Sequence, residues 1–247
     1  MYSYIKGGLV MNEKNNGFAN KGGILGSARA ERLKKVVSED KIVSTRTYNL
    51  VMGGVVLYGL IANAILCNFG DDIVAMGLNP IVILIGYIVL SIAGIAISRK
   101  SNNAFVSFLG YNLVCLPLGL VISICVEAYG GINSRPVQMA FIYTVAITLI
   151  MTLAAIAFPK FFEKIGKVLF ISLIAVAIVG IVSIFVTGLG YIYSLLVAVL
   201  FSFYIGYDFY RSQQFAKSID NAVDCALDIY LDIANLFLAL LRIFGRD

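Results

Sequence analysis

The sequence predicts an all-α polytopic membrane protein with seven transmembrane helices. Hydrophobic residues make up 60% of the 247 residues, charged residues only 13%, and the mean hydropathy is +0.91. Soluble domains are roughly 45–50% apolar and about 25% charged, so most of this chain is solvated by lipid. The apolar residues also gather into blocks that are close to the ~20 residues a helix needs to cross a bilayer.

The first element is a polar and basic lead, residues 1–45, which precedes a membrane domain, residues 46–247. Gly, Asn and Lys dominate the lead to about residue 27, a composition that cannot bury a core. The segment "ARAERLKKVVSED", residues 28–40, fits a short basic helix at the membrane surface, and a solvated, partly ordered tail fits it as well. The lead has no apolar h-region, so we expect no cleavable signal peptide.

Seven apolar blocks follow the lead, and each is expected to be one transmembrane helix. They comprise residues 47–69, 80–98, 104–127, 136–158, 168–187, 189–212 and 222–244. Only the short segment "TGLGYIY" divides the fifth block from the sixth.

The distribution of Lys and Arg predicts how the blocks are oriented. Nine Lys and Arg precede the first block, and zero, two, one, three, zero and two then lie at the ends of the first to sixth blocks or in the segments that follow them. Cytoplasmic segments carry the excess of basic residues, so we expect a multi-pass protein of the inner cell membrane with a cytoplasmic N-terminus. Seven spans then place Arg242 and Arg246 on the non-cytoplasmic side of the membrane, which opposes the preference of basic residues for the cytoplasmic side. A final helix that dips in and returns is the alternative, and we expect seven full spans.

Several classes of chemistry are excluded by composition. The chain has no His, which excludes imidazole chemistry and the usual zinc sites. The four cysteines (Cys67, Cys115, Cys125 and Cys225) show no CxxC pairing, and we expect small buried side chains rather than disulfides or metal ligands. The net charge of +5 reflects membrane topology rather than a nucleic-acid surface. We expect no cofactor and no nucleic-acid partner.

Three aspartates lie deep inside the last two apolar blocks, Asp208, Asp228 and Asp232, and Asp224 lies near the start of the last one. Placing an Asp at the centre of a membrane-spanning helix costs about 2.5–3.5 kcal/mol of insertion free energy, so each of these residues is expected to have a structural or functional role. Asp208 and Asp232 are each 12 residues from Asp220, which lies in the polar break between the blocks. If the chain turns near Asp220, the two aspartates lie at equal depth and can face one another.

The last block carries a stripe of polar residues on one helical face. Asp224, Asp228 and Asp232 are four residues apart, and Asn235 continues the stripe. We expect this stripe to point toward protein or water and to offer a path for an ion. Arg99, at the cytoplasmic end of the second block, either compensates one of these negative charges or anchors its helix at the membrane surface.

Two carboxylates brought together in a low-dielectric site share a proton over part of the pH range. Asp208 and Asp232 then form a pH-sensitive latch, the dyad of an aspartyl hydrolase, or a stretch of cation path. The alternative without function is that each carboxylate caps a backbone or pairs with an arginine.

Four stretches resemble the Bax-inhibitor (transmembrane Bax inhibitor motif) family in its bacterial branch. They are "YNLVMGGVVLYGL", "FPKFFEKIGKVLFISL", "GYDFYRSQQ" and "LDIYLDIANLFLALLRIFG". The resemblance implies that the last helix is central in a ring of six, and that an aspartate pair, Asp208 and Asp232, governs a pH-dependent calcium leak. It also implies that Arg99 pairs with Asp208.

The chain departs from the family pattern in two places. Residues 81–98 contain no carboxylate, where many relatives carry one, and this weakens any inference about calcium coordination there. Asp228 stands where relatives more often have a small polar residue. We expect it to retune the latch or to add a ligand for a cation.

The leading functional hypothesis is therefore a passive, pH-gated calcium leak with no enzymatic activity. Calcium prefers oxygen ligands, and we expect Asp208 and Asp232 to supply them. An intramembrane aspartyl protease is the second hypothesis, although such enzymes have Gly-x-Gly-Asp where this chain has "IYL" before Asp232. The third is a regulatory protein that binds a membrane protease or acts in a stress or death pathway, with residues 1–45 as the binding segment.

Overall fold

A computed structural model of the chain describes residues 2–5, 8–11, 41–77, 79–186 and 188–246. The helices in these ranges are α2 (Thr45–Cys67), α3 (Gly70–Ala75), α4 (Pro80–Lys100), α5 (Ala104–Ala128), α6 (Arg135–Ala157), α7 (Pro159–Phe185), α8 (Leu189–Ser212) and α9 (Ile219–Phe244). Two short antiparallel strands, β1 (Tyr2–Ile5) and β2 (Gly8–Met11), form a hairpin that the sequence analysis did not predict. The surface helix expected at residues 28–40 lies outside the described residues.

Six of these helices, α2 and α4 to α8, are long and apolar enough to cross a membrane. The protein is therefore a polytopic membrane protein. The last helix, α9, has the necessary length of 26 residues, but it carries four aspartates and Arg242 and does not meet the same test of composition.

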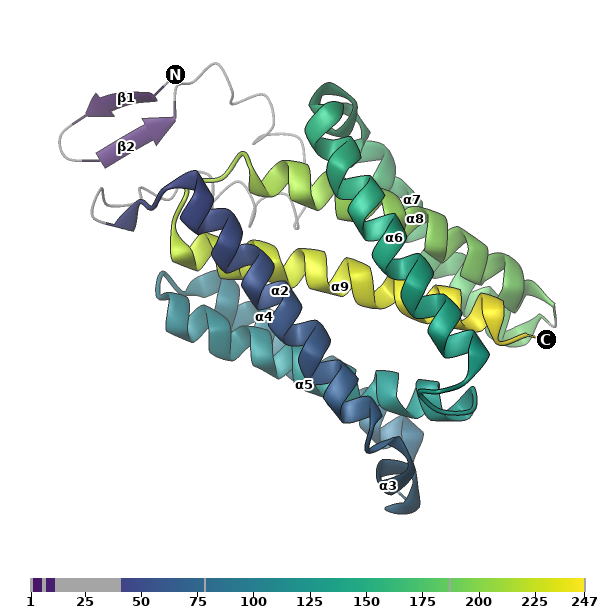
Figure 1. The fold of residues 1–247 in the computed structure, drawn as a ribbon. Coiled ribbons are helices and arrows are strands. Elements are labelled where there is room, and N and C mark those ends of the chain that lie inside the picture. The colour runs from purple at the N-terminus through teal and green to yellow at the C-terminus, as the bar shows by residue number, and fades with distance from the viewer. Residues whose placement is uncertain (1, 6–7, 12–40, 78, 187, 247) are drawn as a thin grey trace.

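The central helix of the bundle is α9, drawn yellow in Figure 1. It runs between a group formed by α2, α4 and α5 and a second group formed by α6, α7 and α8. It packs directly on α2, α5, α6 and α8, whereas α4 packs chiefly on α5 and α7 chiefly on α8. The six apolar helices thus enclose α9 as two groups of three, with α4 and α7 on the outside.

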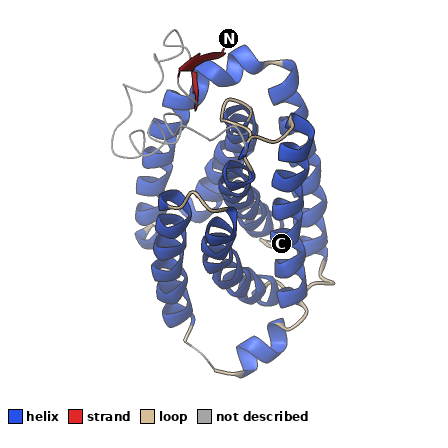
Figure 2. Cartoon of the chain, turned by 90° about the vertical axis from the view of Figure 1, so that its left-hand side faces the viewer, coloured by secondary structure: helices blue, strands red, loops and turns tan. Residues whose placement is uncertain are grey.

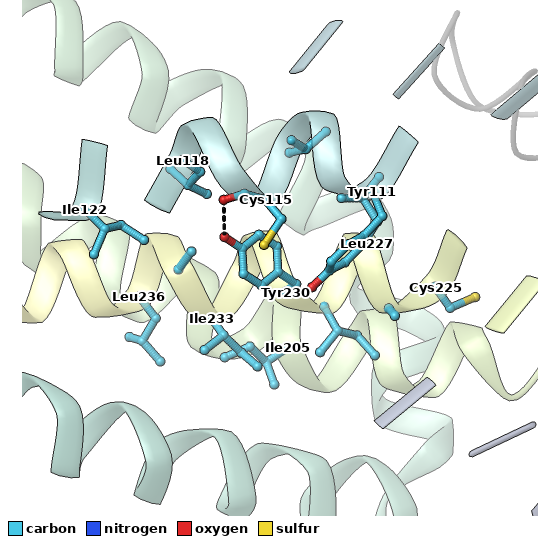
Figure 3. Close-up of a cluster of buried hydrophobic side chains, with 14 of the residues drawn as sticks. Tyr111, Cys115, Leu118, Ile122, Ile205, Cys225, Leu227, Tyr230, Ile233 and Leu236 are labelled. Carbon is cyan, nitrogen blue, oxygen red and sulfur yellow. Dashed lines mark hydrogen bonds between the residues drawn. The ribbon is translucent and has the colours of Figure 1, made fainter. Parts of the chain in front are cut away.

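The core lies along the apolar face of α9 (Figure 3). Its buried side chains Leu227, Tyr230, Ile233 and Leu236 meet Tyr111, Cys115, Leu118 and Ile122 of α5 and Ile205 of α8. All four cysteines are free thiols, and Cys67, Cys115 and Cys225 are buried. The prediction of small buried cysteine side chains is therefore confirmed for these three, and Cys125 is partly buried.

A close helix crossing joins α4 to α5. A Cβ atom added at Gly94 would lie 2.5 Å from the carbonyl oxygen of Gly110, and one added at Gly110 would lie 2.5 Å from the carbonyl oxygen of Gly94. Because neither residue has a side chain, the two backbones pack directly on one another, as small residues allow in membrane helices.

The helices differ from the prediction at several points, and α9, for example, begins at Ile219 rather than residue 222. The fifth helix, α7, begins at Pro159 rather than residue 168, so "PKFFEKIGK" is helical. Pro159 suits the first helical position because it has no backbone N–H to leave unbonded. In addition, α3 occupies the segment after the first span, at the end of the bundle opposite the β-hairpin (Figures 1 and 2).

Candidate functional site

Four aspartates line one face of α9 at intervals of four residues: Asp220, Asp224, Asp228 and Asp232. Asp224 is 2% exposed and Asp232 is 6% exposed, while the Asp228 side chain is 20% exposed. The stripe predicted from the sequence is therefore directed into the protein, and it reaches the first turn of the helix at Asp220.

The ends of α4 and α5 supply polar partners for three of these aspartates. The Ser107 hydroxyl donates to Asp220 Oδ1 at 2.7 Å, and the buried Ser98 hydroxyl donates to Asp224 Oδ1. Arg99 Nη2 lies 3.9 Å from Asp228 Oδ1. These serines were missed by the sequence reasoning, since nothing in an apolar helix distinguishes a serine that faces α9 from one that does not.

Arg99 thus lies beside the aspartate that the sequence left least explained. Asp228, which departs from the family pattern, has a cation within ion-pair distance. The ion pair is partly exposed, with 28% of the Arg99 side chain accessible. The pairing of Arg99 with Asp208, which the resemblance implies, stays a prediction.

Asp208 forms an ion pair with a residue of its own helix. Arg211 Nη1 lies 3.4 Å from Asp208 Oδ1, and the two side chains are 14% and 7% exposed. The Arg211 guanidinium carbon also lies 5.4 Å from the Tyr207 ring centroid and 5.6 Å from that of Phe215. The sequence reasoning missed Arg211, although its i+3 spacing from Asp208 was a usable signal.

The connection between α8 and α9 comes earlier in the chain than the predicted turn near Asp220. It spans residues 213–218, and the Ser218 hydroxyl caps α9 by accepting from the Asn221 N–H at 3.2 Å. Asp220 is therefore inside the first turn of α9 and is not the midpoint of a symmetric turn. Counting from Asp220 does not set the relative depth of Asp208 and Asp232, and their contact stays a prediction.

The remaining predicted site residue, Asn235, is partly buried. Its side-chain nitrogen donates to the Leu231 carbonyl at 2.7 Å, on its own helix. Within the described ranges, no group of three Asp, Glu, Cys or His side chains is placed to hold a metal ion. The calcium site of two carboxylates, Asp208 and Asp232, is not tested by this result and stays a prediction.

A cluster at the start of α2 ties that helix to the α8–α9 connection. Lys217 Nζ donates to the carbonyls of Ser212 at 3.2 Å and Gln213 at 2.9 Å, and it lies 4.4 Å from the Tyr48 ring centroid. Tyr48 Oη lies 3.0 Å from the Ser212 carbonyl and 3.3 Å from Cys225 Sγ. Burial lowers the pKa of Lys217 to about 8, and Cys225 opposes this shift.

After Asp232 the buried residues of α9 are all apolar, and next to Asp232 in the sequence Tyr230 belongs to a buried aromatic cluster. Leu236 and Leu241 are fully buried. The Tyr111 and Tyr230 rings are 5.5 Å apart, and the Tyr230 hydroxyl accepts from Asn63 Nδ2 at 2.5 Å and donates to the Cys115 carbonyl at 3.3 Å (Figure 3). The carboxylate stripe thus runs from the first turn of α9 to the middle of the helix.

Comparison with known proteins gives the chain a family and a set of bacterial relatives. Residues 40–247 match the family described as "Inhibitor of apoptosis-promoting Bax1". An uncharacterized membrane protein of Streptococcus pyogenes serotype M1 is 26% identical over 215 residues, which cover 82% of this chain and 91% of the relative. An uncharacterized protein of Helicobacter pylori strain J99 is 33% identical over 145 residues, 58% of each chain.

Proposed function

The chain belongs to the Bax inhibitor family of membrane proteins, and from that premise we propose that it is a passive, pH-dependent leak for calcium in the inner cell membrane. The observation that carries the proposal is the stripe of carboxylates on α9. It starts at the helix end that carries Asp220 and continues into the bundle as far as Asp232. Carboxylate oxygens are ligands that calcium accepts.

The proposed topology has α9 as a seventh span and the N-terminus in the cytoplasm. The opening of the stripe is then cytoplasmic, because Arg99, Arg211 and Lys217 lie at the same end of the bundle as Asp220. The apolar half of α9, with Leu236 and Leu241 buried, is the barrier in the closed state.

The proposed gate is the pair Asp208 and Asp232, which are 7% and 6% exposed on adjacent, packed helices. At low pH the two carboxyl groups share a proton and hold α8 against α9. When the proton leaves, two negative charges in a medium of low dielectric constant repel one another. The helices then separate at this level, and the stripe becomes continuous with the rest of the path.

Calcium flux into proteoliposomes between pH 6 and pH 8 tests the gate. We expect flux through the wild-type protein to rise with pH. Asp232→Asn cannot ionise, so it should lose most of that rise, while Asp72→Asn, an exposed aspartate of α3, should keep it. The gate is wrong if Asp232→Asn leaves both the flux and its pH profile unchanged.

A further inference from the structure

The first nine residues of α7 extend beyond the apolar part of that helix. The helix has 27 residues, which at 1.5 Å per residue make about 40 Å, close to the thickness of a bilayer with its headgroup layers. The apolar part, residues 168–185, accounts for about 27 Å of this length and spans the hydrocarbon core. The segment "PKFFEKIGK", residues 159–167, therefore lies at the level of the lipid headgroups.

Among the six candidate spans, α7 is the one that faces lipid most. Only 6% of its most apolar stretch is buried in the protein, against 17% or more for each of the other five. Its outer apolar surface includes the exposed side chains of Phe161, Val168 and Ile171, and it continues from the headgroup level into the hydrocarbon core. An acyl chain can lie along this surface.

Three exposed lysines, Lys160, Lys164 and Lys167, lie beside this apolar surface. Their spacing of four and three residues places them on one face of the helix. Glu163 is the only carboxylate in residues 159–167. None of the three ammonium groups forms an ion pair with a carboxylate in the part of the chain that the structure describes. The start of α7 thus has a net positive charge at the level where lipids carry their phosphate groups.

Two close contacts with α8 fix the rotation of this segment. A Cβ atom added at Gly206 would overlap the Phe162 ring, and one added at Gly166 would overlap the Tyr207 ring. Phe162 and Gly166 are each two residues from Lys164, which is about 200° around the helix axis. The face that packs on α8 is therefore opposite the lysines, and the lysines are held toward the surrounding lipid.

We propose that Lys160, Lys164 and Lys167 bind the headgroup of an anionic phospholipid, such as phosphatidylglycerol, whose acyl chain lies along the outer apolar surface of α7. Lysine binds phosphate as a point charge, and basic clusters at the cytoplasmic end of a membrane helix bind anionic lipids. In the proposed topology the site lies in the cytoplasmic leaflet. It uses neither the carboxylates of α9 nor the leak, so it stands or fails independently of the proposed function.

The test uses the absence of tryptophan from the sequence. Val168→Trp places a single fluorescent probe one turn after Lys164, at a side chain that is 61% exposed. The protein is reconstituted in vesicles of equal parts phosphatidylcholine and phosphatidylglycerol, and only one of the two lipids carries brominated acyl chains, which quench tryptophan on contact. We expect phosphatidylglycerol to bind at the probe about fivefold more tightly than phosphatidylcholine, since one lysine near an anionic surface contributes about this much. Val82→Trp, in the first turn of α4 and 63% exposed, should show no preference for phosphatidylglycerol.

Charge variants in the Val168→Trp protein identify the residues that bind the lipid. Replacement of the three lysines of α7 by glutamine should abolish the preference. The matched control is Lys41→Gln with Arg46→Gln and Lys100→Gln, which removes three exposed cations on the same side of the membrane in the proposed topology and should keep the preference. Glu163→Gln removes the negative charge of the segment and should increase it.

Equal quenching by the two brominated lipids at Val168→Trp would overturn the site, because α7 would then contact only unselected lipid. A preference that survives the triple lysine replacement, or that the matched control abolishes equally, would also overturn it. If the triple variant does not fold, Glu163→Gln and a salt concentration of about 0.5 M replace it, since salt screens exposed charges. A preference that does not rise with Glu163→Gln and does not fall in salt then overturns the inference.

Discussion

Single residues explain why an apolar bundle tolerates carboxylates on its central helix. Moving a charged group out of water without a partner is costly. Asp220 and Asp224 accept from serine hydroxyls, and Asp228 lies beside Arg99. These partners come from two neighbouring helices, so the same contacts that offset the loss of hydration also fix the rotation of α9.

Lys217 predicts a pH effect on stability. Its pKa of about 8 in the folded protein is below the ordinary 10.5. Below pH 8 the group is charged in both the folded and the unfolded state, and its burial cost is fully present. Between about pH 8 and 10.5 the folded protein binds fewer protons than the unfolded one, so stability increases with pH.

The measurement compares wild type with Lys217→Met and Lys217→Arg in detergent from pH 7 to 9.5. Neither replacement titrates in this range, so the thermal midpoint of wild type should rise relative to both as the pH increases. Lys217→Arg is the matched control, because it keeps a positive charge. A difference that stays constant with pH would contradict the low pKa.

For these single residues, the sequence predicted that the aspartates share one face of the last helix, but it did not predict their partners. The i+4 spacing of Asp224, Asp228 and Asp232 indicated a single face, and the structure has these residues buried or partly buried on α9. Ser98, Ser107 and Arg211 were missed. Which serine meets which carboxylate depends on how α4 and α5 are rotated against α9, and no local pattern encodes that rotation.

Among the contacts between helices, the crossing of α4 and α5 leaves no room for a larger residue at Gly94. Gly94→Ala places a Cβ 2.5 Å from the Gly110 carbonyl oxygen, so the backbones must move apart. Overpacking of this kind costs about 1–3 kcal/mol. Gly86→Ala on the same helix meets nothing within 4 Å, and it should gain roughly 0.5–1 kcal/mol because alanine favours a helix over glycine.

Unfolding of both variants in mixed detergent micelles distinguishes these effects. Gly94→Ala is expected to unfold at lower denaturant than wild type, and Gly86→Ala at equal or higher denaturant. Equal stability of the two variants would show that the α4–α5 crossing relaxes without cost.

The helices themselves were largely predictable, because apolar length is a local property. The first, second, third, fourth and sixth spans agree with the prediction within two residues at each end. The predicted start of α7 was wrong, because the segment that contains Lys160, Lys164 and Lys167 was interpreted as a loop but forms the first turns of the helix. Long basic side chains extend from a helix end into water, so charge there does not end the helix.

Across the whole molecule, the course of α9 predicts the side of the C-terminus. The helix is continuous for 26 residues, and Arg246 beyond its end stacks on Tyr191, near the start of α8. It therefore runs antiparallel to α8 and does not turn back. With a cytoplasmic N-terminus, we expect a C-terminal alkaline phosphatase fusion to be active and a C-terminal green fluorescent protein fusion to be dark.

Fusions after Ser212, at the opposite end of the bundle, are the control and should give the reverse pattern. A fluorescent C-terminal fusion would contradict the seventh span. The sequence left this point open because Arg242 and Arg246 oppose the charge rule. It also could not show that the six apolar helices form two groups of three, since neighbours in a bundle are set by the fit of whole helix surfaces.

The composition of α9 also bears on how the protein is made. Each of the six apolar helices has the length and hydropathy to enter the bilayer by itself, whereas α9 does not meet that test. It is also synthesised after the other described helices. The partners of its aspartates, Ser98, Arg99 and Ser107, belong to α4 and α5, which leave the ribosome earlier. We therefore expect α9 to enter the membrane by packing on α4 and α5, which replace lipid around its aspartates.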